Sequence, residues 1–236
     1  MRPLFFKTIS CFYYYVIITF MLRGWYLFIA VILLCNVAAA ETIELPNPKT
    51  KGTISVEEAI QKRRSSRAFL TTALTKDQIS QLLWACQGIT DQDWKLRAAP
   101  SAGALYPLEI YLANKDGVFH YLPMENKLNL IIKGDKRPNI SRGALTQTFI
   151  EDAPISIIIT AVYRRTQSKF GIRSERYVDF EAGHAAQNIL LEAQALGLSA
   201  VPIGSFWDDV ISSILELPPD HDPLYIIPIG YEKNEG

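Results

Sequence analysis

The sequence predicts an α+β fold in which helices cover a mixed β-sheet. Helical and strand-like hydrophobic patterns alternate irregularly along the chain, and the strand-like runs are joined by connections of both hairpin and crossover length. This irregular order disfavours a doubly wound parallel sheet, in which strands and helices alternate regularly. The composition is that of an ordinary globular protein, with 49% hydrophobic and 20% charged residues. We therefore expect one folded domain with a single core.

The first forty residues are set apart by two apolar runs. A basic start at Arg23, an apolar stretch over residues 25–37 and an A-x-A site that ends at Ala40 have the order of a secretory signal peptide. A second apolar run lies within residues 1–20, so either Met21 is the true start or the two runs form an uncleaved membrane anchor. We favour the signal peptide and expect an exported, periplasmic protein.

The rest of the chain carries little net charge. Removing the three basic residues of the leader leaves 24 − 3 = 21 basic against 24 acidic residues, a net charge of −3. This balance does not predict a nucleic-acid partner. Cys86 is the one cysteine beyond the leader, which excludes an intrachain disulfide there. It lies in an apolar helical pattern, so we expect a buried and inert thiol.

The region after the leader predicts an extended arm and two helices. Residues 41–54 are rich in Pro, Lys and Thr and predict the arm. Two capping boxes follow, S-V-E-E from Ser55 and T-K-D-Q from Thr75, in which side chains satisfy free backbone N–H groups. Apolar residues at helical spacing continue from each box. We expect a short helix after Ser55 and a longer one after Thr75, closed by Gly88.

The middle of the chain predicts strands separated by loops. Residues 91–97 are polar and predict a loop. Alternating residues at 108–113 and 118–122 predict two strands joined by a turn. Residues 124–139 are poorly patterned and predict a loop with a short helix, whereas residues 141–150 predict a helix.

The second half predicts a buried strand and a long helix. Residues 155–162 form a continuous β-branched run, which is typical of a strand covered on both faces. Residues 164–176 are polar and predict a mobile loop. The longest helical pattern, over residues 177–196, has small residues in its N-terminal half and ends at Gly197. A short strand, a helix and a last strand are expected at residues 199–203, 208–215 and 224–229.

The run R-R-S-S-R-A-F, which begins at Arg63, concentrates anion-binding groups. Arg63, Arg64 and Arg67 lie within five positions of one another and flank two serines, Ser65 and Ser66. A guanidinium offers a planar fork of N–H donors that fits phosphate oxygens in pairs, and a hydroxyl adds a further bond. A helix C-terminus also favours such cations, because they complement the helix dipole. The run by itself fits either interpretation.

A second unusual stretch is A-A-P-S-A-G-A-L-Y-P over residues 98–107. Small residues and prolines dominate it, and this composition allows a flat ligand or another chain to approach the backbone closely. A plain loop more usually carries Asp, Asn or Lys. The stretch therefore favours a binding surface.

No catalytic side chain can be assigned from the sequence. His120, His184 and His221 are isolated, and no His or Cys spacing predicts a metal site. The phosphate loop G-x-x-x-x-G-K-[ST] and the fingerprint G-x-G-x-x-G after a strand are both absent from the sequence. An anion-binding run together with a small-residue stretch suggests a bound organic cofactor that carries the chemistry.

Three motifs together resemble the FMN-dependent nitroreductase superfamily: R-R-S-S-R-A-F, P-S-A-G-A-L-Y-P and P-I-G-S-F. The second, continued as P-S-A-G-A-L-Y-P-L-E-I-Y, looks most like the SagB/ThcOx-type dehydrogenase branch, which includes oxidases of thiazoline and oxazoline rings. The resemblance implies a three-layer α/β/α fold with a mixed, mainly antiparallel sheet. It divides the chain into a leader, an arm, an FMN-binding domain and a tail, at residues 1–40, 41–54, 55–231 and 232–236.

The resemblance also implies a homodimer with two FMN sites at the subunit interface, each formed by both chains. The residues that bind the FMN phosphate and ribityl chain are matched by Arg63, Arg64, Ser65 and Arg67. The segment laid against the ring from the partner subunit is matched by Pro100, Ser101, Ala102, Gly103 and Leu105. The turn that faces the flavin centre is matched by Pro202, Ile203, Gly204 and Ser205, and Gln187 lies near the site.

The implied activity is that of an oxidoreductase that moves hydride or electron pairs through flavin N5, to or from a small organic substrate. The electron donor and acceptor are not specified by the sequence. A C-terminal phosphate-binding Arg of the family is missing, so either Lys233 substitutes for it or FMN is held more weakly. The Lys–Tyr pair of azole-forming members is not matched either, and Tyr106 and Lys169 are the nearest candidates.

The predicted export bears on the cofactor. The leader has no twin-arginine pair, so we expect the apoprotein to cross the membrane unfolded, to acquire flavin outside and to use a reductant other than NAD(P)H. Two alternatives stay open: a flavin-binding module without turnover, and an enzyme that modifies the flavin itself. The joint presence of the motifs disfavours a cofactor-free domain.

Overall fold

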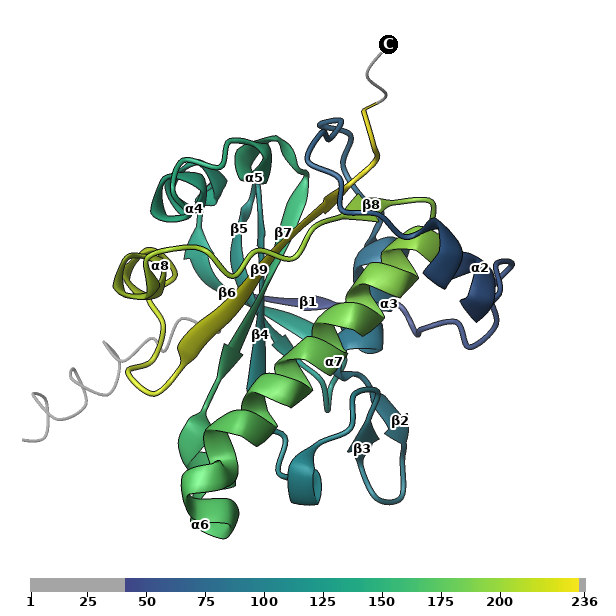
Figure 1. Ribbon diagram of the computed structural model, residues 1–236. Coiled ribbons are helices and arrows are strands. Elements are labelled where there is room, and N and C mark those ends of the chain that lie inside the picture. Colours follow the sequence, from purple (N-terminus) through teal and green to yellow (C-terminus); the bar gives the residue numbers. More distant parts are fainter. Residues whose placement is uncertain (1–40, 234–236) are drawn as a thin grey trace, which may run out of the picture. The chain divides into compact units, whose positions relative to one another are not determined.

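A computed structural model describes residues 41–233, which form a seven-stranded sheet flanked by helices (Figure 1). The strand order is β1-β6-β5-β4-β7-β9-β8, and neighbouring strands are antiparallel throughout. The strands are β1 (Thr42–Glu44), β4 (Leu108–Asn114), β5 (Gly117–Leu122), β6 (Lys127–Lys133), β7 (Ile155–Ala161), β8 (Ser199–Ala200) and β9 (Asp222–Gly230). A separate antiparallel pair consists of β2 (Ile89–Asp91) and β3 (Leu96–Arg97).

Helices cover both faces of the sheet. They are α2 (Val56–Lys62), α3 (Lys76–Gln87), α4 (Arg137–Gly143), α5 (Phe149–Asp152), α6 (Tyr163–Phe170), α7 (Ser174–Ala195) and α8 (Asp208–Ile214), with short 3₁₀ turns η1 (Ala102–Ala104) and η2 (Gly171–Arg173). Ile110 and Leu112 of β4 belong to the core beneath α3 and α7, whereas Tyr111 of the same strand belongs to the core beneath α4 and α8. The predicted α+β fold with a mainly antiparallel, helix-flanked sheet is confirmed (Figure 1).

Strand β7 lies inside the sheet between β4 and β9, and all seven of its residues are buried. Ile157 and Ile159 face the core beneath α7, while Ile158 faces the opposite core. Because both faces are covered, apolar residues point into both cores and the usual alternation with exposed polar residues is lost, although Ser156 and Thr160 are also buried here. The prediction of a doubly buried strand is therefore confirmed, even though its neighbours are antiparallel.

The local signals for helix ends are also confirmed. The Ser55 side chain accepts a hydrogen bond from the Glu58 N–H, and Thr75 forms a complete capping box. Gly197 follows α7 with a φ of 70°, a left-handed conformation that favours glycine. Cys86 is free and fully buried, as expected, and burial raises the pKa of its thiol.

Strand β6 was not predicted, since residues 124–139 were expected to form a loop with a short helix. Leu128 and Ile132 of β6 are buried, but they are four positions apart and Ile131 between them is exposed. The pairing of β6 with β5 shifts register at a bulge beside Val118. The bulge interrupts the alternation of polar and apolar residues by which a strand is recognised.

Three other segments also differ from the prediction. The mobile loop expected at residues 164–176 is largely helical, in α6, η2 and the start of α7. The helix expected at residues 141–150 is broken between α4 and α5, where Leu145 and Thr146 have φ values of 57° and 60°. Residues 91–97 contribute to the small β2–β3 pair, and the arm contains β1.

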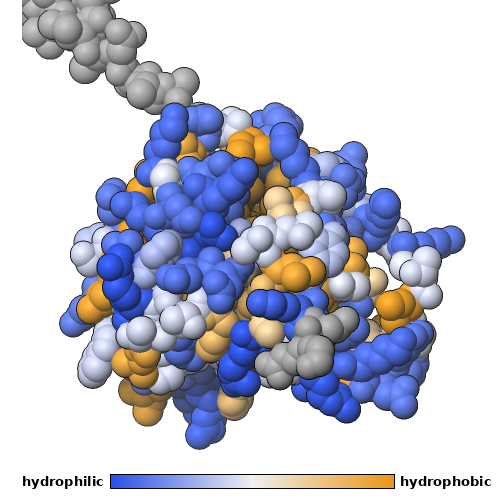
Figure 2. All heavy atoms as spheres, turned by 90° about the horizontal axis from the view of Figure 1, so that it is seen from above, coloured by the Kyte–Doolittle hydropathy of each residue, from blue (hydrophilic) through white to orange (hydrophobic). Residues whose placement is uncertain are grey.

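The predictions for the leader and for residues 234–236 lie outside the described residues. Within residues 41–233, no helix is both long enough and apolar enough to cross a membrane. Seen from above, the surface carries a band of hydrophobic and near-neutral residues across its middle, bordered by hydrophilic residues (Figure 2).

Candidate functional site

The arginine–serine run lies beside the last part of the sheet. It leaves the end of α2 and forms an isolated parallel bridge between Ser65 and Ala200 of β8. The Ser66 N–H donates to the Ala200 carbonyl at 3.3 Å. Beyond the bridge, Phe69 packs with Val201 and pairs with Glu232, so the run lies beside the segment that leads into residues 202–205. Two of the three predicted cofactor segments are thus brought together within one chain.

The three guanidiniums of the run do not serve the same purpose. Arg64 is turned back on α2, where it donates to the carbonyls of Gln61 at 3.0 Å and Arg63 at 2.7 Å. It therefore satisfies the helix end, which is the structural role that the sequence left open. Arg67 is exposed, with its guanidinium 5.9 Å from the centre of the Phe149 ring.

The other donors of the run are available to an anion. Arg63 is half-buried and Ser65 is exposed. None of the ion pairs formed within residues 41–233 involves Arg63, Arg64 or Arg67. Unpaired guanidiniums beside a hydroxyl are the donor set that a phosphate monoester requires. The residues present therefore fit a phosphorylated ligand.

The C-terminal tail adds a further cation to this region. The Lys233 N–H donates to the Ala68 carbonyl at 3.0 Å, and Phe69 forms an isolated bridge with Glu232. Lys233 is exposed and lies beside the residue that follows Arg67. The backbone of Lys233 therefore lies next to the run, and its substitution for the missing C-terminal Arg stays a prediction.

The turn at residues 202–205 is held by backbone hydrogen bonds to β9, and its last two residues are exposed. Ile203 is buried and exchanges two backbone hydrogen bonds with Ile226 of β9, at 2.9 and 3.0 Å. Gly204 and Ser205 are exposed, and a methyl group on Gly204 would meet only Tyr225, at 3.9 Å. The Gln147 side-chain amide donates to the Ser205 carbonyl at 3.1 Å. Gln147 was not predicted, because nothing in its local sequence marks this contact.

The Pro100–Pro107 segment forms a tight turn that contains η1. Gly103, Ala104 and Tyr106 all have positive φ values, of 65°, 54° and 47°. The turn is closed by bonds from the Tyr106 N–H to the Ser101 hydroxyl at 2.9 Å and from the Ala104 N–H to the Ser101 carbonyl at 3.0 Å. Gly103 and Ala104 are exposed. The segment therefore presents backbone rather than large side chains to its surroundings.

This turn and the arginine–serine run lie near different ends of α7. Ser101 lies against Glu181, whereas the run pairs with β8, which follows the end of α7 at Ala195. The 14 residues from Glu181 to Ala195 span about 21 Å of helix. Figure 1 shows η1 near the α6 end of α7 and α2 near the β8 end. Within one chain, these two segments therefore do not come together.

A model of the Nitroreductase family matches residues 60–231. The chain belongs to the nitroreductase family. It is 39% identical over 196 residues to "Putative nitroreductase MJ1384" of Methanocaldococcus jannaschii, covering 80% of this chain and 97% of that protein. Membership identifies it as an oxidoreductase enzyme.

Solved structures agree with this assignment. The crystal structure of a protein described as a putative nitroreductase from Ralstonia eutropha JMP134 matches this chain with a TM-score of 0.76 and 28% sequence identity. That match covers 82% of this chain and 90% of the other. A chain of the E. coli microcin synthetase McbBCD complex shares the fold, with a TM-score of 0.64 and 21% identity, over 83% of this chain and 79% of that one.

Two arginines of this nitroreductase-family chain form hydrogen bonds with the Pro100–Pro107 turn. The Arg97 guanidinium stacks 4.7 Å from the Tyr106 ring centre and donates to Gln87, and its backbone N–H donates to the Tyr106 hydroxyl. Arg165 donates to the Tyr106 carbonyl at 3.0 Å and to Glu109 at 2.5 Å. Neither arginine belongs to a predicted motif, so neither could be selected from the sequence.

Lys169 lies against the same turn. A methyl group on Gly103 would come within 2.9 Å of the Lys169 amine. The two nearest candidates for a Lys–Tyr pair, Lys169 and Tyr106, are thus both brought to the turn. Gln187, by contrast, is exposed on α7 and makes no hydrogen bond within the described part of the chain to any other predicted residue.

A second cluster of titratable groups lies near the start of β4. The His120 imidazole is 2.7 Å from Glu109, and the Tyr111 hydroxyl is 2.8 Å from the His221 ring. Burial alone would raise the pKa of Glu109, but hydrogen bonds from His120 and Arg165 outweigh it and lower this pKa to about 2. Glu109 is therefore ionised at neutral pH and anchors Arg165. In residues 41–233, no group of His, Cys, Asp and Glu is arranged to hold a metal ion.

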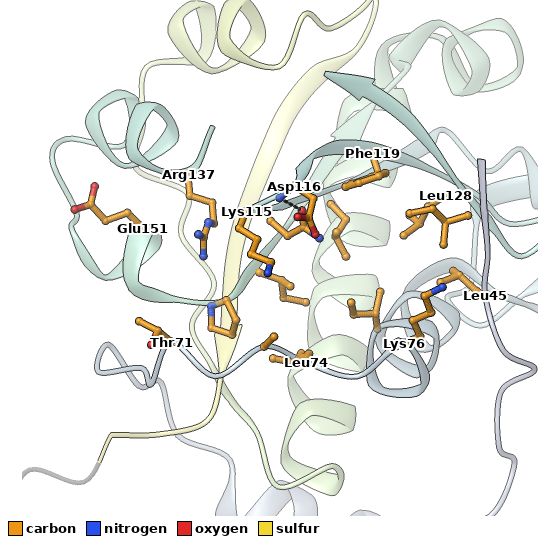
Figure 3. A pocket seen from close by; sticks show the side chains of 17 residues that line it. Leu45, Thr71, Leu74, Lys76, Lys115, Asp116, Phe119, Leu128, Arg137 and Glu151 are labelled. Atoms are coloured by element: carbon orange, nitrogen blue, oxygen red, sulfur yellow. Dashed lines mark hydrogen bonds between the residues drawn. The ribbon is translucent and has the colours of Figure 1, made fainter. Parts of the chain in front are cut away.

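A pocket of about 270 Å³ lies apart from these segments, near the turn between β4 and β5 (Figure 3). Its walls are mainly apolar, with Leu74, Phe119 and Leu128 among them. Lys115 and Arg137 point toward its interior (Figure 3). None of the predicted site residues lines this pocket, so it is not the predicted cofactor site.

Proposed function

We propose that the protein is an FMN-dependent oxidoreductase that works as a homodimer, with each flavin held between two chains. One chain supplies Arg63, Ser65, Arg67 and the turn at residues 202–205, and the partner supplies its Pro100–Gly103 segment and Leu105. The nitroreductase family generally binds flavin, which supports this cofactor. The flavin would exchange hydride with a small organic substrate at its N5 atom.

The observation that carries the proposal is the bridge between Ser65 and Ala200. It joins the anion-binding run to β8 at Ala200, four residues before Gly204, while Ser101 of the same chain lies near the other end of α7. A site that needs all three segments is completed only by a second copy. The separation of these segments within one chain therefore supports a dimer.

The residues present suit both the phosphate and the ring of the cofactor. A phosphate monoester carries roughly −1.5 to −2 charges at pH 7, and Arg63, Arg67 and Lys233 offer cations without an acid partner in the described chain. The ring requires a surface of small residues and a backbone donor. Gly204 is exposed and leaves its surface free of a side chain of its own, whereas Lys169 lies against Gly103.

A more specific proposal concerns the branch of the family. The motif P-S-A-G-A-L-Y-P-L-E-I-Y and the fold shared with a McbBCD chain support a SagB/ThcOx-type dehydrogenase. An exported protein of this kind would receive electrons from a partner or substrate other than NAD(P)H. A dehydrogenase of this type would oxidise a ring or a similar small organic group.

The test is to purify the full chain and record its visible spectrum and the mass of any bound ligand. We expect flavin absorbance and the mass of FMN, both strongly reduced in an Arg63→Ala, Arg67→Ala double variant. A matched control that also removes two exposed cations, Lys133→Ala with Arg142→Ala, should retain the flavin. A colourless wild-type protein that fails to take up added FMN would refute the proposal. Reoxidation no faster than free FMN would favour a non-catalytic flavin protein, and a changed ligand mass would favour a flavin-modifying enzyme.

A further inference from the structure

A chain of hydrogen bonds connects the seven-stranded sheet to the turn that is assigned to the flavin ring. Glu109 of β4 uses both carboxylate oxygens: Oε2 is hydrogen-bonded to the His120 ring at 2.7 Å, and Oε1 accepts a bond from Arg165 at 2.5 Å. Through its other terminal nitrogen, Arg165 donates to the Tyr106 carbonyl at 3.0 Å. Only 15% of the Glu109 side chain is exposed, so the guanidinium is held in one orientation.

Tyr106 is the residue that closes the turn. Its N–H donates to the Ser101 hydroxyl at 2.9 Å, while its carbonyl accepts the bond from Arg165. Its φ of 47° is disfavoured for a residue with a Cβ atom, so this conformation needs support from its surroundings. The next carbonyl, that of Pro107, accepts a bond from the Val162 N–H at 2.8 Å. The junction between β7 and α6 therefore holds two successive carbonyls at the end of the turn.

The two arginines at this turn act on different parts of Tyr106. The Arg97 guanidinium stacks on the ring, 4.7 Å from its centre, whereas the Arg165 guanidinium bonds the backbone. Arg165 is also paired with a carboxylate, and its fork of donors reaches both acceptors at once. The single nitrogen of a lysine could not reproduce this geometry. Arg165 is therefore the side chain that fixes the backbone at the end of the turn.

We propose that Arg165, oriented by Glu109, is a positioning residue for the flavin site of the partner subunit. It fixes Tyr106 and, through the bond to Ser101, the backbone of the Pro100–Gly103 segment. The inference rests on the proposed function in that this segment faces the flavin whose phosphate is bound by the other chain. A change at Arg165 in one chain therefore acts on the site that the other chain's arginine–serine run completes.

The first test compares FMN affinity in the wild type, Arg165→Gln and Arg164→Gln by fluorescence titration. Arg165→Gln should weaken FMN binding about tenfold, as expected when a hydrogen bond from a charged donor is lost. Arg164→Gln is the matched control, because Arg164 is the neighbouring residue of α6 but is 76% exposed and pairs with Asp220. It should keep the wild-type affinity. Equal affinity in the wild type and Arg165→Gln would overturn the inference.

A double variant separates positioning from stability. Arg165→Gln leaves the Glu109 carboxylate without its cation, which lowers stability, whereas Arg165→Gln combined with Glu109→Gln leaves no unpaired charge. Urea denaturation should show that the double variant regains stability relative to Arg165→Gln. It should still bind FMN about tenfold more weakly than the wild type, because the shorter Gln side chain does not reach the Tyr106 carbonyl. Affinity that recovers together with stability would overturn the inference.

Heterodimers test whether the effect crosses the dimer. One chain carries Arg165→Gln, the other carries Arg63→Ala with Arg67→Ala, and two different affinity tags isolate the mixed dimer. If the turn serves the partner's flavin, one site combines an intact arginine–serine run with an intact turn. About half of the sites should then bind FMN with wild-type affinity. If both segments served the same chain's site, both sites would be defective, and that result would overturn the inference.

A last readout needs no flavin. Hydrogen exchange of the Tyr106 amide, which donates to Ser101, should be about tenfold faster in Arg165→Gln than in the wild type or Arg164→Gln. A protein that binds no FMN or stays monomeric, but shows this exchange, would refute the proposed function and retain the role of Arg165 in holding the turn. Unchanged exchange in Arg165→Gln would overturn the inference, whatever the FMN affinity.

Discussion

The side-chain amide of Gln147 donates a hydrogen bond of 3.1 Å to the backbone carbonyl of Ser205. A second bond joins the same two regions, from the Trp207 N–H to the Gly143 carbonyl at 3.0 Å. The connection between α4 and α5 therefore braces the turn that is assigned to the flavin. It also carries Phe149, which lies beneath Arg67.

Replacing Gln147 should weaken flavin binding without unfolding the protein. Gln147→Leu removes a neutral hydrogen bond worth about 1 kcal/mol, so FMN affinity should fall about fivefold. Gln147→Glu should cost more, because a carboxylate repels the Ser205 carbonyl. Fluorescence titration with FMN measures both effects. Gln167→Glu, an exposed change on α6, is the control, and equal losses in the control and in Gln147→Glu would contradict a bracing role.

The same connection stores backbone strain. Thr146 is an exposed, β-branched residue with a φ of 60°, a conformation that costs about 1–2 kcal/mol for a residue with a Cβ atom. Thr146→Gly should raise the free energy of unfolding by about 0.5–1 kcal/mol, after the greater chain entropy of glycine is subtracted. Thr148→Gly, at a φ of −61°, should lower it instead. Urea denaturation distinguishes the two, and a loss in both variants would show that the strain is absent.

The centre of the sheet should dominate stability. Ile158 is fully buried in β7, so Ile158→Ala should destabilise the protein by about 2–5 kcal/mol through lost burial and a residual cavity. Ile172 is 100% exposed, and Ile172→Ala should change stability by less than about 0.5 kcal/mol. Urea denaturation of both variants checks this contrast. Similar losses of stability in the two variants would contradict the prediction that burial in the sheet dominates stability.

Local signals in the sequence were sufficient for much of the fold. The hydroxyl groups of Ser55 and Thr75 cap helices wherever the following residues can be helical, and the β-branched run of β7 requires cover on both faces. The arginine–serine run and the turn at residues 202–205 were recognised as motifs. Their proximity was implied by the family, and it follows physically from one bridge at Ser65.

Other features could not be predicted because they depend on distant partners. The bulge at Ile131 of β6, opposite Val118 and Phe119 of β5, interrupts the alternating pattern of β6, and α6 is held by contacts of Arg165 with Tyr106 and Glu109. Glu181 looks in sequence like a polar position on an ordinary helix face. Only the packing of α7 against the Pro100–Pro107 turn buries it.

The carboxyl of Glu109 should make stability depend on pH. Its folded pKa is about 2, below the ordinary value of 4.5, because the hydrogen bonds from His120 and Arg165 outweigh burial. Its folded state therefore binds the proton less tightly than the unfolded state, so its stabilisation is complete above about pH 4.5 and is lost as pH falls toward about 2. The shift corresponds to at most about 3 kcal/mol.

Glu109→Gln should accordingly lower the free energy of unfolding at neutral pH, and its difference from the wild type should shrink as the pH is lowered from about 5 to about 3. Urea denaturation at several pH values measures this difference. Glu125→Gln is the control, since Glu125 is exposed and forms a surface ion pair with Lys127 at 3.7 Å. It should follow the wild type, because an exposed pair contributes little. A difference for Glu109→Gln that stays constant over the whole range would mean that the carboxyl acts by packing rather than by charge.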